Sequence, residues 1–352
     1  MYSKTYPLTC VWEVTMACNM RCKHCGSSCE HALPGELTTD EAFKFIDMCK
    51  DVGMKWVSIS GGEPFTRPDL IEIVKRFEEK GILINIISNG WLIGEDIIGK
   101  LKDVRGLRVN ISIDGPEYIH DDVRKPGSFA RSSKSFELLR KNGIASGCIT
   151  TITKKNIDHL NELKHFLIDK GVECWQLQIG LPMGNLAKRA GWVISPEEVN
   201  KIIDFCYDTA MEGKIDIYPA DCVGYYGEKQ GEIYKKVYDI DFVPEWEGCN
   251  AGTNSFGLLH NGDVVGCTSI RDKEYIEGNI KNRSLRDIWE DPNSFKWIRK
   301  FDVNKLKGDC LRCDHKEKCK GGCPNTRYCM NGTMDSENLY CTQNLLMKSK
   351  IK

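Results

Sequence analysis

The stretch LTCVWEVTMACNMRCKHC, residues 8–25, begins as an apolar segment and ends in three cysteines with the spacing CxxxCxxC. Its first part, LTCVWEV (8–14), predicts a β-strand. Cys18, Cys22 and Cys25 would then share one tight loop directly after that strand. Three thiolates on such a loop can ligate three irons of a cubane iron–sulfur cluster, which needs four ligands in all. One iron would therefore stay open for another molecule.

The segments that follow repeat one pattern, a strand and then a helix. Five further strands are predicted, at residues 55–60, 82–88, 107–114, 144–153 and 172–180. Repeated βα units with near-continuous apolar strands indicate a parallel sheet or barrel. Beyond residue 220 this periodicity fails. There SFGLLHNGDVVGCTS (255–269) predicts a hairpin around Asn261-Gly262, a pair that fits a type I′ turn. Residues 301–341 are so poor in aliphatic side chains that we expect them to fold around metal.

The composition of the 352 residues excludes several classes of partner and site. Lysine and arginine together number 49 against 50 acidic residues, so no net charge draws the chain to nucleic acid or to an anionic membrane. The first 17 residues lack the apolar core of a signal peptide, and no run is long enough to span a bilayer, which predicts a cytoplasmic protein. In that reducing compartment the 18 cysteines are not a disulfide framework. They indicate metal binding or redox chemistry.

Three further motifs lie where predicted strands end. GGEP (61–64) follows the second strand, SNG (88–90) the third, and SIDG (112–115) the fourth. A barrel places its active site at these carboxyl ends. Ordinary glycine and serine turns would account for each motif alone, but not for all three in this order behind CxxxCxxC. With these motifs the chain resembles the radical S-adenosylmethionine (SAM) enzymes, in which the amino and carboxylate groups of SAM chelate the open iron.

The resemblance implies a role for each motif. GGEP would receive the amino group of SAM, the ends of the third and fourth strands would contact its ribose and carboxylate, and Arg124 would bind the carboxylate. Cys29 would not be a ligand, because a fourth thiolate closes the cluster, and we expect a structural thiol there. The implied ligands of the first cluster are Cys18, Cys22 and Cys25, and the implied SAM contacts are Gly61, Gly62, Glu63, Pro64, Ser88, Asn89, Ser112, Asp114 and Arg124.

A second group of cysteines lies near the carboxyl terminus. Cys249 and Cys267 frame the predicted hairpin, the spacing CX2CX5CX3C covers residues 310–323, and Cys341 follows. This order resembles the SPASM domain of one branch of radical SAM enzymes, which carries auxiliary iron–sulfur clusters. The implied ligands are Cys310, Cys313, Cys319 and Cys341 for one cluster, and Cys249, Cys267 and Cys323 for the other, whose fourth ligand stays open among Cys222, Cys329, a non-cysteine group and a substrate atom. A zinc ribbon is the alternative, although seven cysteines exceed one tetrahedral site.

Together these resemblances imply the fold and the cofactors. The fold would be a partial (β/α)6 TIM-like barrel over residues 1–220, followed by a small cysteine-rich SPASM domain over residues 221–352. The cofactors would be SAM and three 4Fe-4S clusters, one catalytic and two auxiliary. A 5′-deoxyadenosyl radical would take a hydrogen atom from the substrate. Cys222, beyond the last predicted barrel helix, is a candidate hydrogen donor, with core packing as the alternative.

Relatives with a SPASM domain mostly modify ribosomally made peptides, so the resemblance implies a peptide that is cross-linked, oxidised or epimerised. Thr268 after Cys267 disfavours oxidation of a sulfatase residue, because those relatives carry an aspartate beside one auxiliary-cluster cysteine. The chain starts at the first strand, which predicts a separate leader-binding protein, and a donor such as flavodoxin or ferredoxin would supply electrons. The alternatives are a small molecule, such as a tetrapyrrole side chain or an amino sugar, and a non-catalytic electron carrier.

Overall fold

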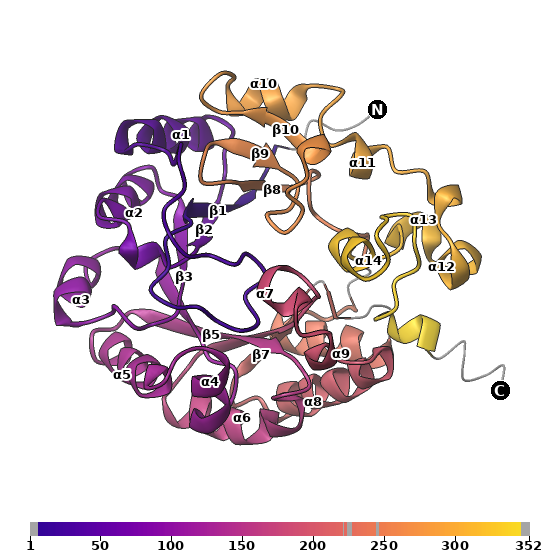
Figure 1. Cartoon of the computed structure of the whole chain (residues 1–352), viewed down its shortest axis with the longest axis horizontal. Coiled ribbons are helices and arrows are strands. Elements are labelled where there is room, and N and C mark those ends of the chain that lie inside the picture. Colours follow the sequence, from indigo (N-terminus) through magenta and orange to yellow (C-terminus); the bar gives the residue numbers. More distant parts are fainter. Residues whose placement is uncertain (1–5, 221, 224–226, 244–245, 346–352) are drawn as a thin grey trace.

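The protein folds around one sheet of ten strands, in the spatial order β10-β9-β8-β1-β2-β3-β4-β5-β6-β7. The structure, a computed structural model, describes residues 6–220, 222–223, 227–243 and 246–345. Strands β1 to β7 run parallel and curve into a barrel wall (Figure 1). The strands are β1 (Thr9–Thr15), β2 (Trp56–Gly61), β3 (Leu83–Ser88), β4 (Leu107–Ser112), β5 (Ala145–Ile152), β6 (Cys174–Ile179), β7 (Asp216–Pro219), β8 (Ser255–Leu258), β9 (Asp263–Val265) and β10 (Ile276–Asn279).

Helices lie mostly on the outside of this wall (Figure 1). They are α1 (Thr39–Asp51), α2 (Leu70–Glu79), α3 (Glu95–Leu101), α4 (Glu117–Val123), α5 (Ser128–Lys141), α6 (Leu160–Asp169), α7 (Gly184–Ala187), α8 (Val199–Glu212), α9 (Glu228–Val237), α10 (Leu285–Glu290), α11 (Lys296–Arg299), α12 (Gly308–Arg312), α13 (Lys316–Cys319) and α14 (Pro324–Asn331). The cysteine-rich helices α12, α13 and α14, yellow in Figure 1, fill the side of the barrel between its first and last strands. None of the described helices combines the length and apolar character that a membrane crossing requires.

The outer layer is held by apolar faces of the helices. In α1, Thr38 and Glu41 form the predicted capping box, which satisfies free N–H groups at the start of the helix. Phe45 of α1 and Phe77 of α2 meet the ring of Trp12 edge to face, with centroids 5.3 and 6.3 Å apart. Trp12 is fully buried. Alternate residues of each strand therefore face the helices, and those between them face the barrel interior.

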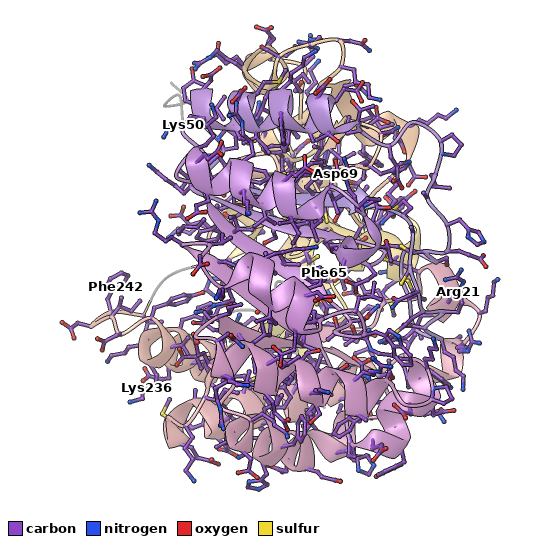
Figure 2. The ribbon with its side chains drawn as sticks, turned by 90° about the vertical axis from the view of Figure 1, so that its left-hand side faces the viewer. Arg21, Lys50, Phe65, Asp69, Lys236 and Phe242 are labelled. Atoms are coloured by element: carbon purple, nitrogen blue, oxygen red, sulfur yellow. The ribbon has the colours of Figure 1, made fainter. Side chains whose placement is uncertain are left out.

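The barrel has two distinct ends, which Figure 2 shows from the side. Lys50, at the end of α1, and Phe242, beyond α9, lie on one side of the view, and Arg21 and Asp69 lie on the other. Arg21 belongs to the first cysteine loop, after β1. The side of Arg21 therefore corresponds to the carboxyl ends of the strands, and the side of Phe242 to their amino ends.

All six predicted strands are confirmed, and the structure adds a seventh, β7. This strand escapes sequence analysis because it has four residues and ends in Pro219. The predicted hairpin is confirmed as β8 and β9, but its type I′ turn is wrong. Of Asn261 and Gly262 only the glycine has a positive φ, 92°, whereas type I′ needs both. Gly262 N–H instead donates to Leu259 O at 3.0 Å, which closes a longer turn.

The sheet continues across residue 220, where the domain boundary was predicted. β8 pairs in parallel with β1, from Thr9 opposite Ser255 to Trp12 opposite Leu258. The hairpin of the cysteine-rich region therefore extends the barrel sheet beyond its first strand.

Candidate metal centres and active site

The first cysteine loop follows β1 and is held by main-chain contacts. Cys18 N–H donates to Glu30 O at 3.2 Å, and Arg21 donates to the carbonyl of Cys18 at 2.7 Å. Burial raises the pKa of Cys22 to about 12, and the charges of Cys25 and Cys18 act in the same direction. The charges of Cys25 and Cys18 thus act on Cys22, and a shared cluster for the three sulfurs stays a prediction.

Two contacts around this loop were not foreseen from sequence. Cys29 is buried against Cys25, and a hydrogen bond between the two thiols lowers the pKa of Cys25. Arg271, beyond the β8–β9 hairpin, donates to Ser27 Oγ at 2.6 Å and also to the carboxylate of Glu13. Burial raises the pKa of Glu13 to about 7. Arg271 therefore joins the cysteine-rich region to the first loop and to the barrel interior.

The GGEP segment lies against the chain that leads into the cysteine loop. Gly62 N–H and Glu63 N–H donate to the carbonyls of Thr15 and Ala17, both at 2.8 Å. A Cβ atom on Gly61 would lie 2.2 Å from the Thr15 oxygen, and one on Gly62 would lie 2.1 Å from the Ala17 oxygen. Glycine is therefore required at both positions for the two segments to approach so closely.

Glu63 joins the ends of the second and third strands. Its carboxylate accepts hydrogen bonds from Ser88 Oγ at 2.9 Å and Asn89 N–H at 2.7 Å. Burial raises the pKa of Glu63 to about 7. The Asn89 amide donates to Asn19 Oδ1, within the cysteine loop, at 2.7 Å, and the buried Asn19 Nδ2 has no partner among the described residues. Pro64 is buried at the start of the short 3-10 helix that follows. Hydrogen bonds thus join these strand ends to the cysteine loop, and the Nδ2 of Asn19 is left as a donor that could bind another molecule.

Asp114, just beyond β4, anchors the cysteine loop. Its carboxylate accepts hydrogen bonds from Arg124 Nε at 2.6 Å, His24 Nε2 at 2.9 Å and Thr151 N–H at 3.0 Å. Burial acts to raise the pKa of Asp114, but Arg124 and His24 hold it well below its usual range. Arg124 also reaches the sulfur of Cys22, at 4.0 Å. The carboxylate therefore positions the arginine beside the first cysteine group, and His24, which no sequence motif singled out, ties the loop to β4.

Replacing Asp114 with asparagine is expected to lower the free energy of unfolding by about 3–5 kcal/mol, because Arg124, whose side chain is only 10% exposed, loses its counter-ion. Urea denaturation measures this loss. Asp122→Asn is the matched control, since Asp122 pairs with Lys23 of the same loop at 2.6 Å but on the surface, where an ion pair contributes about 1 kcal/mol or less. Equal losses in the two variants would contradict the anchoring role of Asp114.

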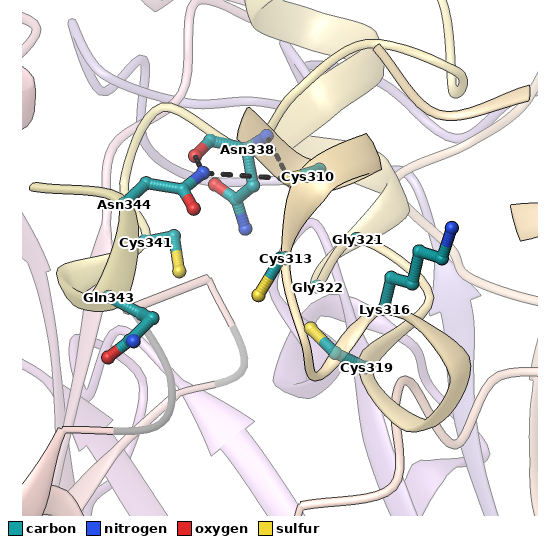
Figure 3. A pocket seen from close by; sticks show the side chains of 10 residues that line it. All are labelled: Cys310, Cys313, Lys316, Cys319, Gly321, Gly322, Asn338, Cys341, Gln343 and Asn344. Atoms are coloured by element: carbon teal, nitrogen blue, oxygen red, sulfur yellow. Dashed lines mark hydrogen bonds between the residues drawn. The ribbon is translucent and has the colours of Figure 1, made fainter. Parts of the chain in front are cut away.

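One cavity in the carboxyl-terminal region is lined by four predicted ligands. It has a volume of about 20 Å³, and the sulfurs of Cys313, Cys319 and Cys341 point into the same space (Figure 3). The sulfur of Cys310, the fourth lining cysteine, accepts hydrogen bonds from Asn338 N–H at 3.4 Å and from Asn344 Nδ2 at 3.5 Å. In the part of the chain that the structure describes, no three His, Cys, Asp or Glu side chains converge tightly enough to hold a single metal ion.

The other predicted ligands gather around α14. Cys323 is the N-cap of α14, and Cys249 lines a small cavity with both chain neighbours of Cys323. Cys329 lies on α14, and burial raises its pKa to about 12 with the help of the charges on Cys323 and Cys267. Of the open candidates for a fourth ligand, Cys329 is thus in electrostatic contact with this group.

Cys222 follows β7 in the sequence and lies against Ile179, the last residue of β6. Its sulfur accepts a hydrogen bond from Ile179 N–H at 3.2 Å, and its charge raises the pKa of Tyr340, although burial is the larger cause. These contacts place the predicted hydrogen donor at the junction of the barrel and the carboxyl-terminal region.

Side chains that point into the barrel leave a cavity of about 770 Å³. It opens at the amino ends of the strands, where Trp56 and Leu83 are 50% and 53% exposed, and it reaches as far as Ile87 and Asn110. The SNG motif follows Ile87 directly, and the half-buried Ser112 lies two residues beyond Asn110, about 7 Å along a strand. The cavity therefore ends below the strand ends that carry the predicted SAM contacts.

Known proteins resemble the chain along almost its whole length. An "AdoMet-dependent heme synthase" of Methanosarcina barkeri (strain Fusaro / DSM 804) is 32% identical over 95% of this chain and 96% of its own. The "Mycofactocin maturase MftC" of Mycobacterium ulcerans (strain Agy99) is 26% identical over 96% and 88%. The crystal structure of Streptococcus suis SuiB bound to precursor peptide SuiA shares the fold, with a TM-score of 0.74 and 18% identity over 95% of this chain and 75% of that one.

Two family matches agree with the geometry of the two cysteine regions. Residues 12–167 match the Radical SAM superfamily and hold the first cysteine loop and the strand-end motifs. Residues 249–314 match the SPASM iron–sulfur cluster-binding domain, which excludes the zinc ribbon as the principal interpretation of this region. With the heme synthase relative, these matches show that the chain is an enzyme of the radical SAM superfamily with a SPASM domain, and that its cofactors are SAM and 4Fe-4S clusters.

Proposed function

We propose that this enzyme abstracts a hydrogen atom from a side-chain carbon of a tetrapyrrole. The observation that carries the proposal is the barrel cavity, whose volume of about 770 Å³ lies within the range of small-molecule sites. A substrate held there would present a C–H bond to the SAM site above it, and such positioning is a large part of what a protein contributes to radical chemistry. The heme synthase relative supports the same substrate class.

The cavity wall offers apolar faces to a flat ring and one cation to a carboxylate. Trp56, Leu83 and Tyr238 line the mouth and are about half exposed. Arg108 also lines the cavity and pairs with Glu173 at 3.1 Å, with 41% and 51% of the two side chains exposed. Because an exposed ion pair is weak, a substrate carboxylate can replace Glu173 as the partner of Arg108.

For the radical step we assign the first cluster to Cys18, Cys22 and Cys25. SAM bound to that cluster supplies, after one-electron reduction, a radical able to abstract hydrogen. The chain's own part would be positional: the GGEP backbone and the Asn19 amide, whose Nδ2 has no partner among the described residues, would face the cofactor. Glu63 fixes the strand ends, and Asp114 would hold Arg124 in place for the SAM carboxylate. The proposed SAM contacts are Gly61, Gly62, Glu63, Pro64, Ser88, Asn89, Ser112 and Arg124, with Asp114 acting through Arg124.

For the auxiliary clusters we assign one set of ligands to each cysteine group. Loss of a hydrogen atom leaves a carbon radical, and a closed-shell product then requires the loss of one more electron. When bound, auxiliary clusters supply an acceptor for that electron or a ligand for the substrate. The proposed sets are Cys310, Cys313, Cys319 and Cys341 for one cluster, and Cys249, Cys267, Cys323 and Cys329 for the other.

The test is anaerobic turnover with an iron tetrapyrrole that carries carboxylates. The reconstituted enzyme is incubated with SAM, dithionite and Fe-coproporphyrin III, and the products are analysed by mass spectrometry. We expect 5′-deoxyadenosine whose formation depends on the tetrapyrrole, together with a tetrapyrrole of altered mass. An unchanged tetrapyrrole beside steady 5′-deoxyadenosine formation would refute this substrate class but not the radical reaction.

A peptide substrate is the second candidate, and the relative named mycofactocin maturase favours it. Sequence analysis favours a peptide over a small molecule. The barrel cavity, whose volume suits a small molecule, leads us to place the tetrapyrrole first. Under this candidate a separate leader-binding protein would deliver the peptide, and for both candidates we propose flavodoxin or ferredoxin as the electron donor. Modification of a co-expressed short peptide, with no effect on tetrapyrroles, would favour the peptide.

Arg108→Ala is expected to weaken tetrapyrrole binding about tenfold or more, because a hydrogen bond between charged groups contributes about 1.5–3 kcal/mol. Absorbance titration with Fe-coproporphyrin III measures the dissociation constant. Arg105→Ala is the matched control, since Arg105 lies three residues earlier, pairs with Glu78 at the surface and does not line the cavity. An unchanged dissociation constant for the Arg108 variant would exclude this carboxylate contact.

A further inference from the structure

Arg327, on α14, is a buried cation that lacks an ion pair with any carboxylate of the described residues. It is 2% exposed and forms no ion pair with the described residues. Its Nη2 donates to Lys320 O at 3.0 Å, its Nη1 donates to Met334 O, and its Nε has no partner among the described residues. The guanidinium also lies 5.2 Å from the centre of the Phe301 ring. Neutral oxygens and a ring compensate a buried charge poorly, so an anion must lie close by.

The position of Arg327 relative to the cysteines identifies that anion. The guanidinium lies against the CKGGC loop, because a Cβ atom on Gly321 would be 3.1 Å from Arg327 Cζ. Arg327 also lines the small cavity that contains Cys249. Gly321 itself lies between Cys319 of one auxiliary group and Cys323 of the other. Burial lowers the pKa of Arg327, and the charges of Cys310, Cys323, Cys319 and, as the smallest of these causes, Asp335 oppose this. The guanidinium is therefore close to cysteines of both auxiliary groups.

We propose that Arg327 is a cation shared by the two auxiliary clusters, which compensates their negative charge and raises the reduction potential of both. The inference rests on the ligand sets assigned above. A 4Fe-4S cluster with four thiolates is an anion, and reduction makes it more negative. A fixed positive charge in a poorly solvated site therefore stabilises the reduced form more than the oxidised form. Arg327 is a positioning residue in this role, since it acts through the clusters and touches no substrate.

The test is an EPR-monitored redox titration of the full chain without substrate. The background variant carries alanine at Cys18, Cys22 and Cys25, so that only auxiliary signals remain. Arg327→Gln should lower the midpoint potentials of both auxiliary clusters, and Arg327→Lys, which keeps the charge, should restore most of the shift. Arg299→Gln is the control, because Arg299 also donates to main-chain carbonyls, those of Gly252 and Trp289, and stacks on aromatic rings.

Each result decides the question. Unchanged potentials in an iron-loaded Arg327→Gln protein would overturn the proposal, as would equal shifts in the glutamine and lysine variants. If the glutamine variant loses auxiliary iron, retention of iron by the lysine variant supports a role of charge, and equal loss overturns it. Auxiliary iron that is absent before Arg327 is changed would refute the ligand assignment itself. None of these readouts depends on the identity of the substrate.

Discussion

Alanine in place of Cys18, Cys22 and Cys25 together is expected to abolish 5′-deoxyadenosine formation and to leave the auxiliary iron in place. The three thiols form one group on a single loop, and the proposed auxiliary ligands all lie beyond residue 248. Iron should therefore fall by about one third, since one of three cubane clusters is lost. Liquid chromatography measures 5′-deoxyadenosine, and a colorimetric assay measures iron.

The control for this variant is Cys49→Ala. Cys49 is a fully buried thiol on α1 and belongs to neither cysteine group, so this change should leave cofactor cleavage at the level of the unchanged chain. Continued 5′-deoxyadenosine formation by the triple variant would overturn the assignment of the first cluster.

The second large effect is expected for Cys267→Ala, which should separate cofactor cleavage from product formation. Radical generation depends on the first loop and the strand ends, whereas Cys267 belongs to the proposed auxiliary set around α14. We expect product formation to fall by more than about tenfold, because even indirect partners of a metal site contribute tenfold or more, while 5′-deoxyadenosine formation persists. Both products are measured in the same anaerobic reaction by mass spectrometry.

Cys206→Ala provides the comparison, since Cys206 is buried on α8 and belongs to neither cysteine group. Product formed at the normal rate by folded Cys267→Ala would show that this cysteine is dispensable for turnover. A variant that loses its fold, seen as a collapse of circular dichroism, would show instead that the metal contributes mainly to the stability of a region with little apolar core.

Local patterns predicted most of the barrel, because each predicted strand is an apolar run followed by a helix, and some of these helices have a clear start signal, such as Thr38 and Glu41. What escaped prediction depends on contacts between distant residues. β7 is too short to show a period. The parallel pairing of β8 with β1 joins residues 246 positions apart, such as Thr9 and Ser255, and no local pattern encodes such a partner.

In the candidate site, too, local motifs were predicted and contacts between distant residues were not. The motifs located the cysteine loops and the strand ends because their spacing is constrained by chemistry. They did not reveal that Asp114 binds both Arg124 and His24, since that network unites three segments only in the folded chain. Arg327 belongs to no motif, and it draws attention only because it is buried and its Nε has no partner in the part of the chain that the structure describes. The proposed substrate class also changed, from a peptide to a tetrapyrrole. Sequence alone could not show this, because the volume of a cavity is a property of the packed barrel.

Because β8 pairs with β1, the barrel and the carboxyl-terminal region should not be separable as two stable fragments. A barrel truncated after β7 would leave β1 as a naked strand edge, and such edges recruit other chains into aggregates. Amides of β1 and β8 should resist hydrogen exchange together and open in one cooperative event. Loss of iron that loosens the carboxyl-terminal hairpin would then also destabilise β1, which leads into the first cysteine loop. Iron loss at the carboxyl-terminal clusters should therefore weaken the binding of SAM at the first loop.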